Sequence, residues 1–301
     1  MSKRARFWRS QALEGYLCIL PWLVSFVCFT ALPMVGSLAV SLTNWSLLSP
    51  PQWIGFGNYR QLLADPLFYT TVYNTAYITF FSLPLRLTLA LLLALGLNQK
   101  LRGVNVYRTI CFLPSQMPVV ASALIWLWVL NPDFGLANVL LTFLGLPPLK
   151  WLFDVNLAKP SIVLISLWGG TGTAMIIFLA GLQGVPESLY EAASIDGAGR
   201  WTRFVAVTLP MISPVIFFNL IIGIIASFQD YFALVYVTTQ GGPANATLIY
   251  IIYLFFKGFQ DFQMGYASAL AWLLFCVVVI LTAVQFLAAR RWVYYEVSEG
   301  R

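Results

Sequence analysis

The sequence contains no histidine, only four cysteines, and charged residues amounting to just 9% of the chain. The absence of histidine excludes nucleophilic catalysis by Ser–His–Asp or Cys–His arrangements. The cysteines are far apart within apolar segments, which excludes a zinc site of the usual Cys/His spacing and argues against a disulfide framework. We interpret all four as buried apolar thiols: Cys18, Cys28, Cys111 and Cys276. No metal site and no catalytic residue are expected.

The sequence also lacks a nucleotide-binding loop. It has no G-x-x-x-x-G-K-[ST] run, the segment that cradles nucleotide phosphates. The glycine-rich segment 169–173 lies inside an apolar run with no lysine after it, so we interpret it as a surface for close helix packing. We therefore expect a chain that is not an enzyme and has no cofactor. Its energy would come from a partner, an ion gradient or nothing.

The scarcity of charge decides the class of protein. Soluble globular domains carry about 25% charged residues, whereas this chain carries 9% and is 60% hydrophobic. A soluble fold could not cover that much apolar surface with so few charges. The net charge of +6 comes from 17 Lys and Arg residues scattered between apolar runs. Because they form no basic face, we take them as signals of membrane topology and expect no nucleic-acid partner.

Six apolar segments are long enough to cross the hydrocarbon core of a membrane, which requires about 20 residues. They predict an all-α, polytopic membrane protein with spans at 15–43, 71–97, 107–131, 160–183, 211–237 and 264–289. The first segment follows several basic residues, as a signal peptide does, but its apolar run is far longer than the roughly 7–15 residues of a signal sequence. We expect a retained helix that bends at Pro21 and Pro33.

Basic residues predict the orientation of these spans. With both termini in the cytoplasm, twelve of them lie on the inner side: Lys3, Arg4, Arg6, Arg9, Lys100, Arg102, Arg108, Arg200, Arg203, Arg290, Arg291 and Arg301. Four lie on the outer side: Arg60, Lys150, Lys159 and Lys257. Arg86 falls inside the second span. This bias favours six transmembrane helices with N-in and C-in ends.

The outer connections, 44–70, 132–159 and 238–263, are rich in Trp, Tyr, Pro and Gly and suit interfacial loops with short amphipathic helices. Gly241-Gly242-Pro243 is expected to end the fifth span, because glycine adopts positive φ and proline cannot continue a helix. The apolar segment 249–259 is too short to cross and should lie at the interface or re-enter the membrane.

The inner loop 184–210 differs from the others because it predicts two short helices. Pro186 suits the first helical residue and Gly197 a helix stop. A second helix is expected at 200–207, where Trp201, Phe204 and Val207 form an apolar stripe, and Leu209-Pro210 should end it before the fifth span. Two short helices that expose small residues and a carboxylate would make a knob for docking into another protein.

Motifs in this loop resemble the EAA loop of binding-protein-dependent ABC importer permeases. The matching positions are Glu191-Ala192-Ala193, Asp196-Gly197-Ala198, Phe204 and Leu209-Pro210, with Val207 where isoleucine is more usual. Further motifs are similar to the carbohydrate branch, in particular the maltose-type first permease subunit. They are Phe56-Gly57-Asn58-Tyr59, Asp65-Pro66, Asn74-Thr75, Phe112-Leu113-Pro114, Gly241-Gly242-Pro243 and Gly265-Tyr266-Ala267-Ser268-Ala269.

The resemblance implies a fold, a mechanism and partners. The fold would be a type I ABC importer permease, one transmembrane domain over 1–301 with core spans at 71–289. The loop 184–210 would sit in a cleft of an ATP-binding subunit, anchored by Glu191 and turned at Gly197, and would move when two such subunits close around ATP and Mg²⁺. The partners would be those two ATP-binding subunits, a second permease chain in a heterodimer, and an extracytoplasmic solute-binding protein. The location would be the cytoplasmic membrane of a bacterium or archaeon, and the substrate a carbohydrate, either an oligosaccharide or a related polyol.

Candidate residues for the substrate path are polar or aromatic groups within the spans, because intramembrane charges are rare and usually functional. They are Arg86, Asn219, Phe228, Gln229, Asp230 and Tyr231. Weaker candidates are Gln116, Trp126 and Trp168. For Arg86, pairing with a carboxylate such as Asp230 and a purely structural role in helix packing both remain open.

Other functions compete with a sugar importer. A permease for phosphorylated polyols lies within the same class, with Arg86 as the feature that would favour an anion. A secondary transporter driven by H⁺ or Na⁺ would require a relay of intramembrane carboxylates or histidines, and Asp230 is the only such residue in the spans. An intramembrane enzyme or an assembly scaffold is a further alternative, but an enzyme should have paired acidic residues or histidines at the membrane face.

Overall fold

The computed structural model describes residues 3–99 and 102–294, with side chains from residue 14 onward. Lys100 and Arg301, and the side chains of Lys3, Arg4, Arg6 and Arg9, which count toward the inner basic residues above, lie outside this described part. Within it the regular structure is helical, apart from two isolated β-bridges, which confirms the all-α prediction. The α-helices, with 3₁₀ and π turns marked η, are in order α1 (Lys3–Phe26), η1 (Val27–Ala31), α2 (Leu32–Ser41), α3 (Gly57–Ala64), α4 (Pro66–Leu97), α5 (Val104–Phe112), η2 (Leu113–Gln116), α6 (Val119–Val129), α7 (Leu136–Phe143), η3 (Trp151–Phe153), α8 (Ala158–Gln183), α9 (Glu187–Ile195), α10 (Arg200–Arg203), η4 (Phe204–Thr208), α11 (Leu209–Met211), α12 (Ser213–Ser227), α13 (Tyr231–Thr238), α14 (Tyr250–Phe255), η5 (Phe256–Gln260) and α15 (Met264–Ala289).

Four helices of the described chain are long and apolar enough to cross a membrane: Glu14–Ser41, Pro66–Leu97, Ala158–Gln183 and Met264–Ala289. The other two predicted spans are bent pairs, so the described chain has up to six crossing segments if each pair counts as one. Segment Val104–Gln116 meets Val119–Val129 at 96°, and Arg200–Met211 meets Ser213–Ser227 at 62°. Pro118 explains the first bend, because proline has a fixed φ, lacks an N–H and favours an extended residue before it.

The first span shows how prolines are tolerated differently along one helix. Helix α1 continues through Pro21, whereas the π-helical turn η1 stands directly before Leu32 and Pro33 at the start of α2. In the first turn of a helix the missing proline N–H has no partner to lose. The irregularity nearest to Pro33 is thus the π turn Val27–Ala31, and the bends expected at Pro21 and Pro33 stay predictions.

The chain divides into two compact units, and the first comprises Met1–Asp65 with Leu254–Phe275. Within this unit the buried Asn58 side-chain amide donates to the carbonyls of Ser41 at 2.7 Å and Thr43 at 2.9 Å, satisfying the end of α2. Gly265 lies so close to the Thr43 carbonyl that a β-carbon would collide with it. The buried amide of the Phe56–Tyr59 motif therefore acts as a helix cap.

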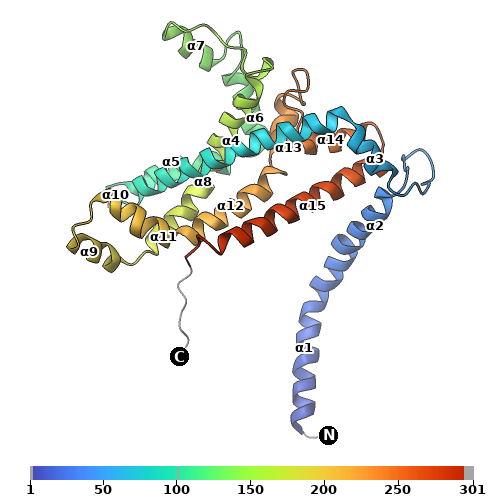
Figure 1. Ribbon diagram of the computed structural model, residues 1–301, viewed down its shortest axis with the longest axis horizontal. Coiled ribbons are helices and arrows are strands. Elements are labelled where there is room, and N and C mark those ends of the chain that lie inside the picture. The colour runs from blue at the N-terminus through green and yellow to red at the C-terminus, as the bar shows by residue number, and fades with distance from the viewer. Residues whose placement is uncertain (1–2, 100–101, 295–301) are drawn as a thin grey trace. The chain divides into compact units, whose positions relative to one another are not determined.

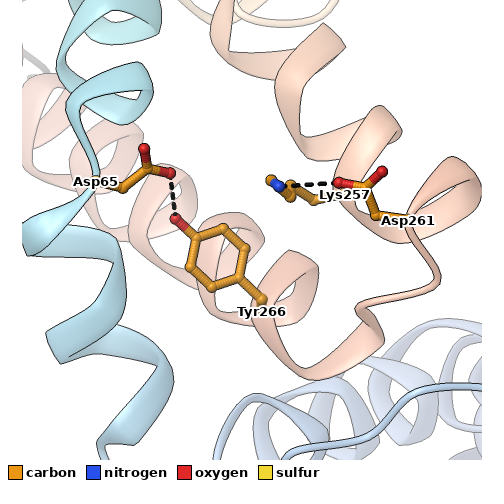
Figure 2. A network of polar contacts seen from close by, with 4 residues as sticks. All are labelled: Asp65, Lys257, Asp261 and Tyr266. Carbon is orange, nitrogen blue, oxygen red and sulfur yellow. Dashed lines mark hydrogen bonds and ion pairs between the residues drawn. The ribbon is translucent and has the colours of Figure 1, made fainter.

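One hydrogen bond in this unit joins two further motif residues, and one ion pair lies nearby. Figure 2 shows the Tyr266 hydroxyl donating to Asp65 at 2.9 Å, and Lys257 paired with Asp261 at 2.9 Å. Asp65 belongs to the Asp65-Pro66 motif and Tyr266 to the last motif noted in the sequence. The hydrogen bond between Asp65 and Tyr266 thus connects two motifs that are far apart in the sequence.

The second unit comprises Pro66–Tyr253 with Cys276–Arg301. In it α4 packs along α8, and α12 packs on both, as Figure 1 shows. Small residues on α4 make this close approach possible, since Ala90 and Ala94 are fully buried against Met175 and Phe178 of α8. Close contact through small side chains is the usual way for helices to associate in a membrane.

Asn74 on α4 clamps the loop that follows α13. Its amide donates to the carbonyls of Asn245 at 2.9 Å and Leu248 at 3.0 Å, while its carbonyl oxygen accepts from Lys159 at 3.1 Å. The adjacent Thr75 hydroxyl accepts from the backbone N–H of Tyr250 at 2.9 Å. Helix α13 ends at Thr238, which confirms that the Gly241-Gly242-Pro243 segment follows the end of the fifth span.

Asn138 on α7 holds the loop between α6 and α8 by hydrogen bonds to its backbone, as Asn74 holds the loop after α13. Its amide donates to the carbonyls of Pro132 and Leu149, both at 2.9 Å. Its carbonyl oxygen accepts from the Leu149 N–H at 3.0 Å and from the Trp151 indole at 2.8 Å. Both N–H donors and both acceptor lone pairs of this side chain are therefore used.

The cysteine prediction was half wrong. All four cysteines are unbonded thiols, as expected, but Cys18, Cys28 and Cys276 are exposed and Cys111 is only half-buried. Burial of apolar side chains is a rule of water-soluble proteins. A membrane-spanning chain instead directs large apolar groups outward and small ones inward.

We expect Asn74→Ala to lower the thermal unfolding temperature of the purified chain in detergent. The change leaves two carbonyls of the following loop without their donor and Lys159 without its acceptor, a cost of about 1–3 kcal/mol per unsatisfied buried group. Thr70→Val on the same helix is the matched control, because Thr70 is half-buried and its hydroxyl bonds only to the Pro66 carbonyl of its own helix. Equal unfolding temperatures for the two variants would show that the clamp contributes nothing.

Candidate functional site

The loop 184–210 forms a compact turn between α9 and α10. Helix α9 ends at Ile195, and Gly197 then takes a φ of +76°, the left-handed conformation that suits glycine. The Ala198 N–H reaches back to the Ala193 carbonyl at 2.9 Å, closing the helix end in the manner of a Schellman motif. The predicted helix stop at Gly197 is confirmed.

Side-chain hydrogen bonds join the two sides of this turn. The hydroxyls of Tyr190 and Thr208 are 3.0 Å apart, which links α9 to η4. Arg203 donates to the Ser194 hydroxyl at 3.0 Å, and Ser194 donates to the Tyr190 carbonyl at 2.7 Å. The loop therefore has an internal framework of its own.

Two boundaries in this loop differ from the sequence prediction. Pro186 is the residue before the helix, with α9 beginning at Glu187. The second helix does not end at Leu209-Pro210, because α10 continues as the π turn η4 and then as α11 to Met211. Pro210 lies in the first turn of α11, where a missing N–H costs little, so the bend comes instead at Ile212, before Pro214.

The loop presents charge and apolar surface together. Glu191 and Asp196 are exposed, as are Ala192 and Gly197. Beside them Ile195 is 86% exposed and Trp201 75% exposed, with the Trp201 ring 5.6 Å from that of Phe204. The sequence reasoning missed Ile195, and it assigned Trp201 to a stripe without expecting such exposure. Two large exposed apolar residues beside two carboxylates are typical of a protein-docking surface.

The rest of the predicted coupling set is less accessible than the carboxylates. Ala193, Ala198, Phe204 and Leu209 are partly buried, and Pro210 is exposed. The four predicted groups of motif residues thus lie within one turn-and-helix segment, which leads into α12.

A cavity of about 350 Å³ opens between α4, η2, α6, α8, α12 and α13 of the second unit. Four of the six predicted path residues line it: Arg86, Asn219, Asp230 and Tyr231. Phe228 and Gln229 are not part of its lining. A volume of this size falls within the range of ligand pockets.

Glycines of two neighbouring helices make room for Arg86. A β-carbon on Gly170 of α8 would lie 2.7 Å from Cδ and 2.9 Å from Nη1 of Arg86. A β-carbon on Gly223 of α12 would lie 3.0 Å from Nη2 of Arg86 and would collide with Leu83. The glycine-rich run therefore serves close packing as predicted, but part of what it packs against is the arginine.

The other polar groups of the cavity differ in how far they are already bonded. The Tyr231 hydroxyl shares a hydrogen bond with Ser82, and the Asn219 amide donates to the Val215 carbonyl of its own helix at 3.0 Å. Asp230 is exposed and lies in the break between α12 and α13, not on a continuous span helix as predicted. Irregular backbone at membrane depth is tolerated where it lines a cavity.

Sequence reasoning missed several hydroxyl groups that line the cavity. They are Ser115, Ser122, Ser166, Thr173 and Ser227. The proline pair on either side of Ser115, at Pro114 and Pro118, was the available signal, since it marks the broken third span. Of the weaker candidates, Trp126 and Trp168 pack edge to face at 5.8 Å, away from the cavity lining. No cluster of metal-ligating side chains occurs among the described residues.

We expect Gly170→Ala to destabilise the chain, because its methyl group would meet the Arg86 side chain. Overpacking of this kind costs about 1–3 kcal/mol. Gly169→Ala is the matched control, since its neighbouring β-carbon would meet nothing within 4 Å. Thermal unfolding in detergent should separate the two variants, and an equal effect would mean that Arg86 moves aside at no cost.

Known proteins share this architecture over nearly the whole chain. "Probable ABC transporter permease protein YesP" of Bacillus subtilis is 39% identical, covering 99% of this chain and 97% of that protein. "Trehalose/maltose transport system permease protein MalF" of Thermococcus litoralis is 36% identical, covering 93% and 95%. The crystal structure of a bacterial alginate ABC transporter, in complex with an alginate pentasaccharide-bound periplasmic protein, has a chain that is 25% identical with a TM-score of 0.85, covering 95% of this chain and 98% of that one. Residues 86–294 match the model of the "Binding-protein-dependent transport system inner membrane component". The chain belongs to this family of ABC transporter permeases.

Proposed function

We propose that the chain is one transmembrane subunit of an ATP-driven importer that carries a carbohydrate, an oligosaccharide or a related polyol, across the cytoplasmic membrane of a bacterium or archaeon. The observation that carries this proposal is the match to a trehalose/maltose permease over 93% of the chain. The likeness to a chain of an alginate transporter adds a second glycan importer. ATP and Mg²⁺ are bound by partner subunits.

The proposed topology has six spans with both ends in the cytoplasm. The four long helices and the two bent pairs would give six crossings if each pair counts as one span, and the distribution of basic residues favours this orientation. All of 1–301 then forms one permease domain with core spans at 71–289. In this arrangement the loop 184–210 faces the cytoplasm.

The loop 184–210 is proposed to dock into an ATP-binding subunit. The residues assigned to this coupling are Glu191, Ala192, Ala193, Asp196, Gly197, Ala198, Phe204, Leu209 and Pro210. The exposed carboxylates of Glu191 and Asp196 suit charge-assisted hydrogen bonds. The exposed Ile195 and Trp201 suit apolar pockets on the same partner.

Movement of the loop has a direct route to the cavity. Segments α10, η4 and α11 lead into α12 through a 62° bend at Ile212, and α12 carries Asn219 and Gly223 at the cavity wall. When two ATP-binding subunits close around ATP, a displacement of the docked loop would be carried along this helix. The spans would then change from inward-open to outward-open.

The cavity is the proposed part of the substrate path within this chain. The assigned residues are Arg86, Asn219, Phe228, Gln229, Asp230 and Tyr231, with the first, second and last two of these at the cavity wall. Hydroxyl, amide and charged groups set among apolar side chains suit a sugar, which has hydroxyl groups and apolar C–H faces. A second permease chain, in a heterodimer, would complete the path, and an extracytoplasmic solute-binding protein would deliver the substrate.

A permease for phosphorylated polyols is the second candidate function. The specific observation in its favour is the guanidinium of Arg86 in the wall of the cavity. Transport driven by an ion gradient has less support, because Asp230 is the one carboxylate among the lining residues of this cavity.

We expect Gly197→Asp and Glu191→Lys each to reduce ATP-coupled uptake at least roughly tenfold, as loss of an interface hot spot does. The first variant forces a β-carbon into a left-handed turn, and the second reverses an exposed charge. Both variants should still insert into the membrane, which immunoblotting of membrane fractions would check. Gly199→Ala is the matched control, because Gly199 has a φ of −69° and open space around it. Normal uptake by both coupling variants would remove the docking role from this loop.

Affinity purification of the tagged chain from its native membranes, in mild detergent, tests the proposed function directly. Mass spectrometry should recover an ATP-binding subunit and a second permease. A chain that is recovered alone, or only with copies of itself, even after cross-linking, would contradict the proposal and favour uptake driven by a gradient.

A further inference from the structure

The Arg86 guanidinium differs from three other described cations of the second unit, Lys159, Arg203 and Arg108, in what surrounds its charge. Lys159 donates to Asn74 and lies over the rings of Tyr73 at 4.8 Å and Tyr77 at 5.5 Å. Arg203 donates to Ser194, and Arg108 donates to the Leu97 carbonyl at 3.0 Å. Among the residues that the structure describes, no hydrogen bond or ion pair satisfies the guanidinium of Arg86.

The position of this guanidinium is built into the fold. Gly170 and Gly223 leave the space that the Arg86 side chain fills, on two different helices. Its nitrogens are not among the buried polar atoms that lack a partner, so they are accessible from the cavity that the residue lines. An arginine has five N–H donors in a planar fork that matches carboxylate and phosphate oxygens.

Asp230 is the counter-charge within the same cavity, but it leaves Arg86 open to a ligand. Arg86 acts on Asp230 electrostatically, yet the two side chains form no ion pair among the described contacts. Asp230 lies in the exposed break between α12 and α13, whereas Arg86 is held in the glycine-lined position on α4. The cavity therefore offers one fixed cation with unused donors.

A charge at the middle of a membrane span is costly unless it pairs with another group or serves a function. We propose that the Arg86 guanidinium binds a negatively charged group of the substrate, so that the carbohydrate carried is anionic, with a carboxylate or a phosphate on one of its units. This inference rests on the proposed import of a carbohydrate and narrows its substrate class. The shared chemistry is a pair of oxygens that accept hydrogen bonds from the two ends of the guanidinium.

The test uses the whole transporter with its associated solute-binding protein, reconstituted in liposomes, and measures ATP hydrolysis stimulated by four probes. The first two probes differ only in their carboxylates: digalacturonate and the neutral digalactose of the same linkage. Two are a phosphate pair, glycerol 3-phosphate and glycerol. We expect one anionic probe to stimulate the wild-type transporter, and the pair it belongs to identifies carboxylate or phosphate as the group bound.

In Arg86→Gln the half-maximal concentration of the stimulating anion should rise roughly tenfold to a hundredfold, the loss expected for a charge-assisted hydrogen bond. Arg86→Lys should keep part of the response, because it retains the charge without the planar fork. Arg60→Gln removes the same charge from the exposed surface of the first unit and should change nothing. Basal ATP hydrolysis reports whether each variant assembles.

The outcomes separate this inference from the proposed function. Stimulation by a neutral sugar alone, or an unchanged response to the anion in Arg86→Gln, would overturn the anionic substrate and leave carbohydrate import standing. If the Gln variant fails to assemble, a Lys variant with a wild-type response would likewise contradict recognition by the planar fork. A transporter that responds to none of the four probes would count against both.

Discussion

A backbone that crosses hydrocarbon has no water to bond to, so every peptide group must find its partner within the protein. Long helices meet this requirement by themselves, and the chain deviates from them at few places. The break between η2 and α6 and the break between α12 and α13 both border the cavity. Where helices end outside the long spans, buried amide side chains supply the missing bonds, as Asn58, Asn74 and Asn138 do. These two helix breaks, unlike the bend at Ile212, therefore coincide with the part of the chain that has space for a ligand.

The same constraint connects the inner loop to the cavity. A helix is stiff along its axis because its hydrogen bonds run in that direction, and the segment from Arg200 through α12 is helical except at the bend near Ile212. The π turn η4 lies within this segment, and such turns occur often at functional sites. If the loop 184–210 docks as proposed, its coupling to the distant cavity requires such a helical path, since disordered chain would not transmit a displacement.

Sequence reasoning predicted the helical class, the approximate spans and the stop at Gly197, because composition and glycine placement are local signals. It did not predict the sharp bend at Pro118, since an apolar run looks the same whether it is straight or broken. Pro21, which leaves its helix continuous, shows that proline alone does not decide the matter. The exposure of Cys18, Cys28 and Cys276 was missed because burial rules from water do not apply at a lipid-facing surface.

Only part of the candidate site was predicted, because polar residues in apolar runs are a local signal whereas the space between helices is not. Arg86, Asn219, Asp230 and Tyr231 were selected as polar groups in apolar runs, and they do line one cavity. Phe228 and Gln229 were selected by their position beside Asp230, but a turn directs neighbouring side chains differently from a helix. The space that Gly170 and Gly223 leave for Arg86 joins three helices, and no single segment of sequence contains that information.

The hydrogen bonds between Tyr190 and Thr208 and between Arg203 and Ser194 give the inner loop a mechanical property. A loop that deforms easily would change its own shape when the proposed ATP-binding subunit moves. The movement would then not reach the membrane-spanning helices. By bracing the turn from both sides, these side chains lower its compliance, so that force applied at the tip is delivered to α12. The stiffness of this small segment would thus determine how tightly ATP hydrolysis is coupled to transport.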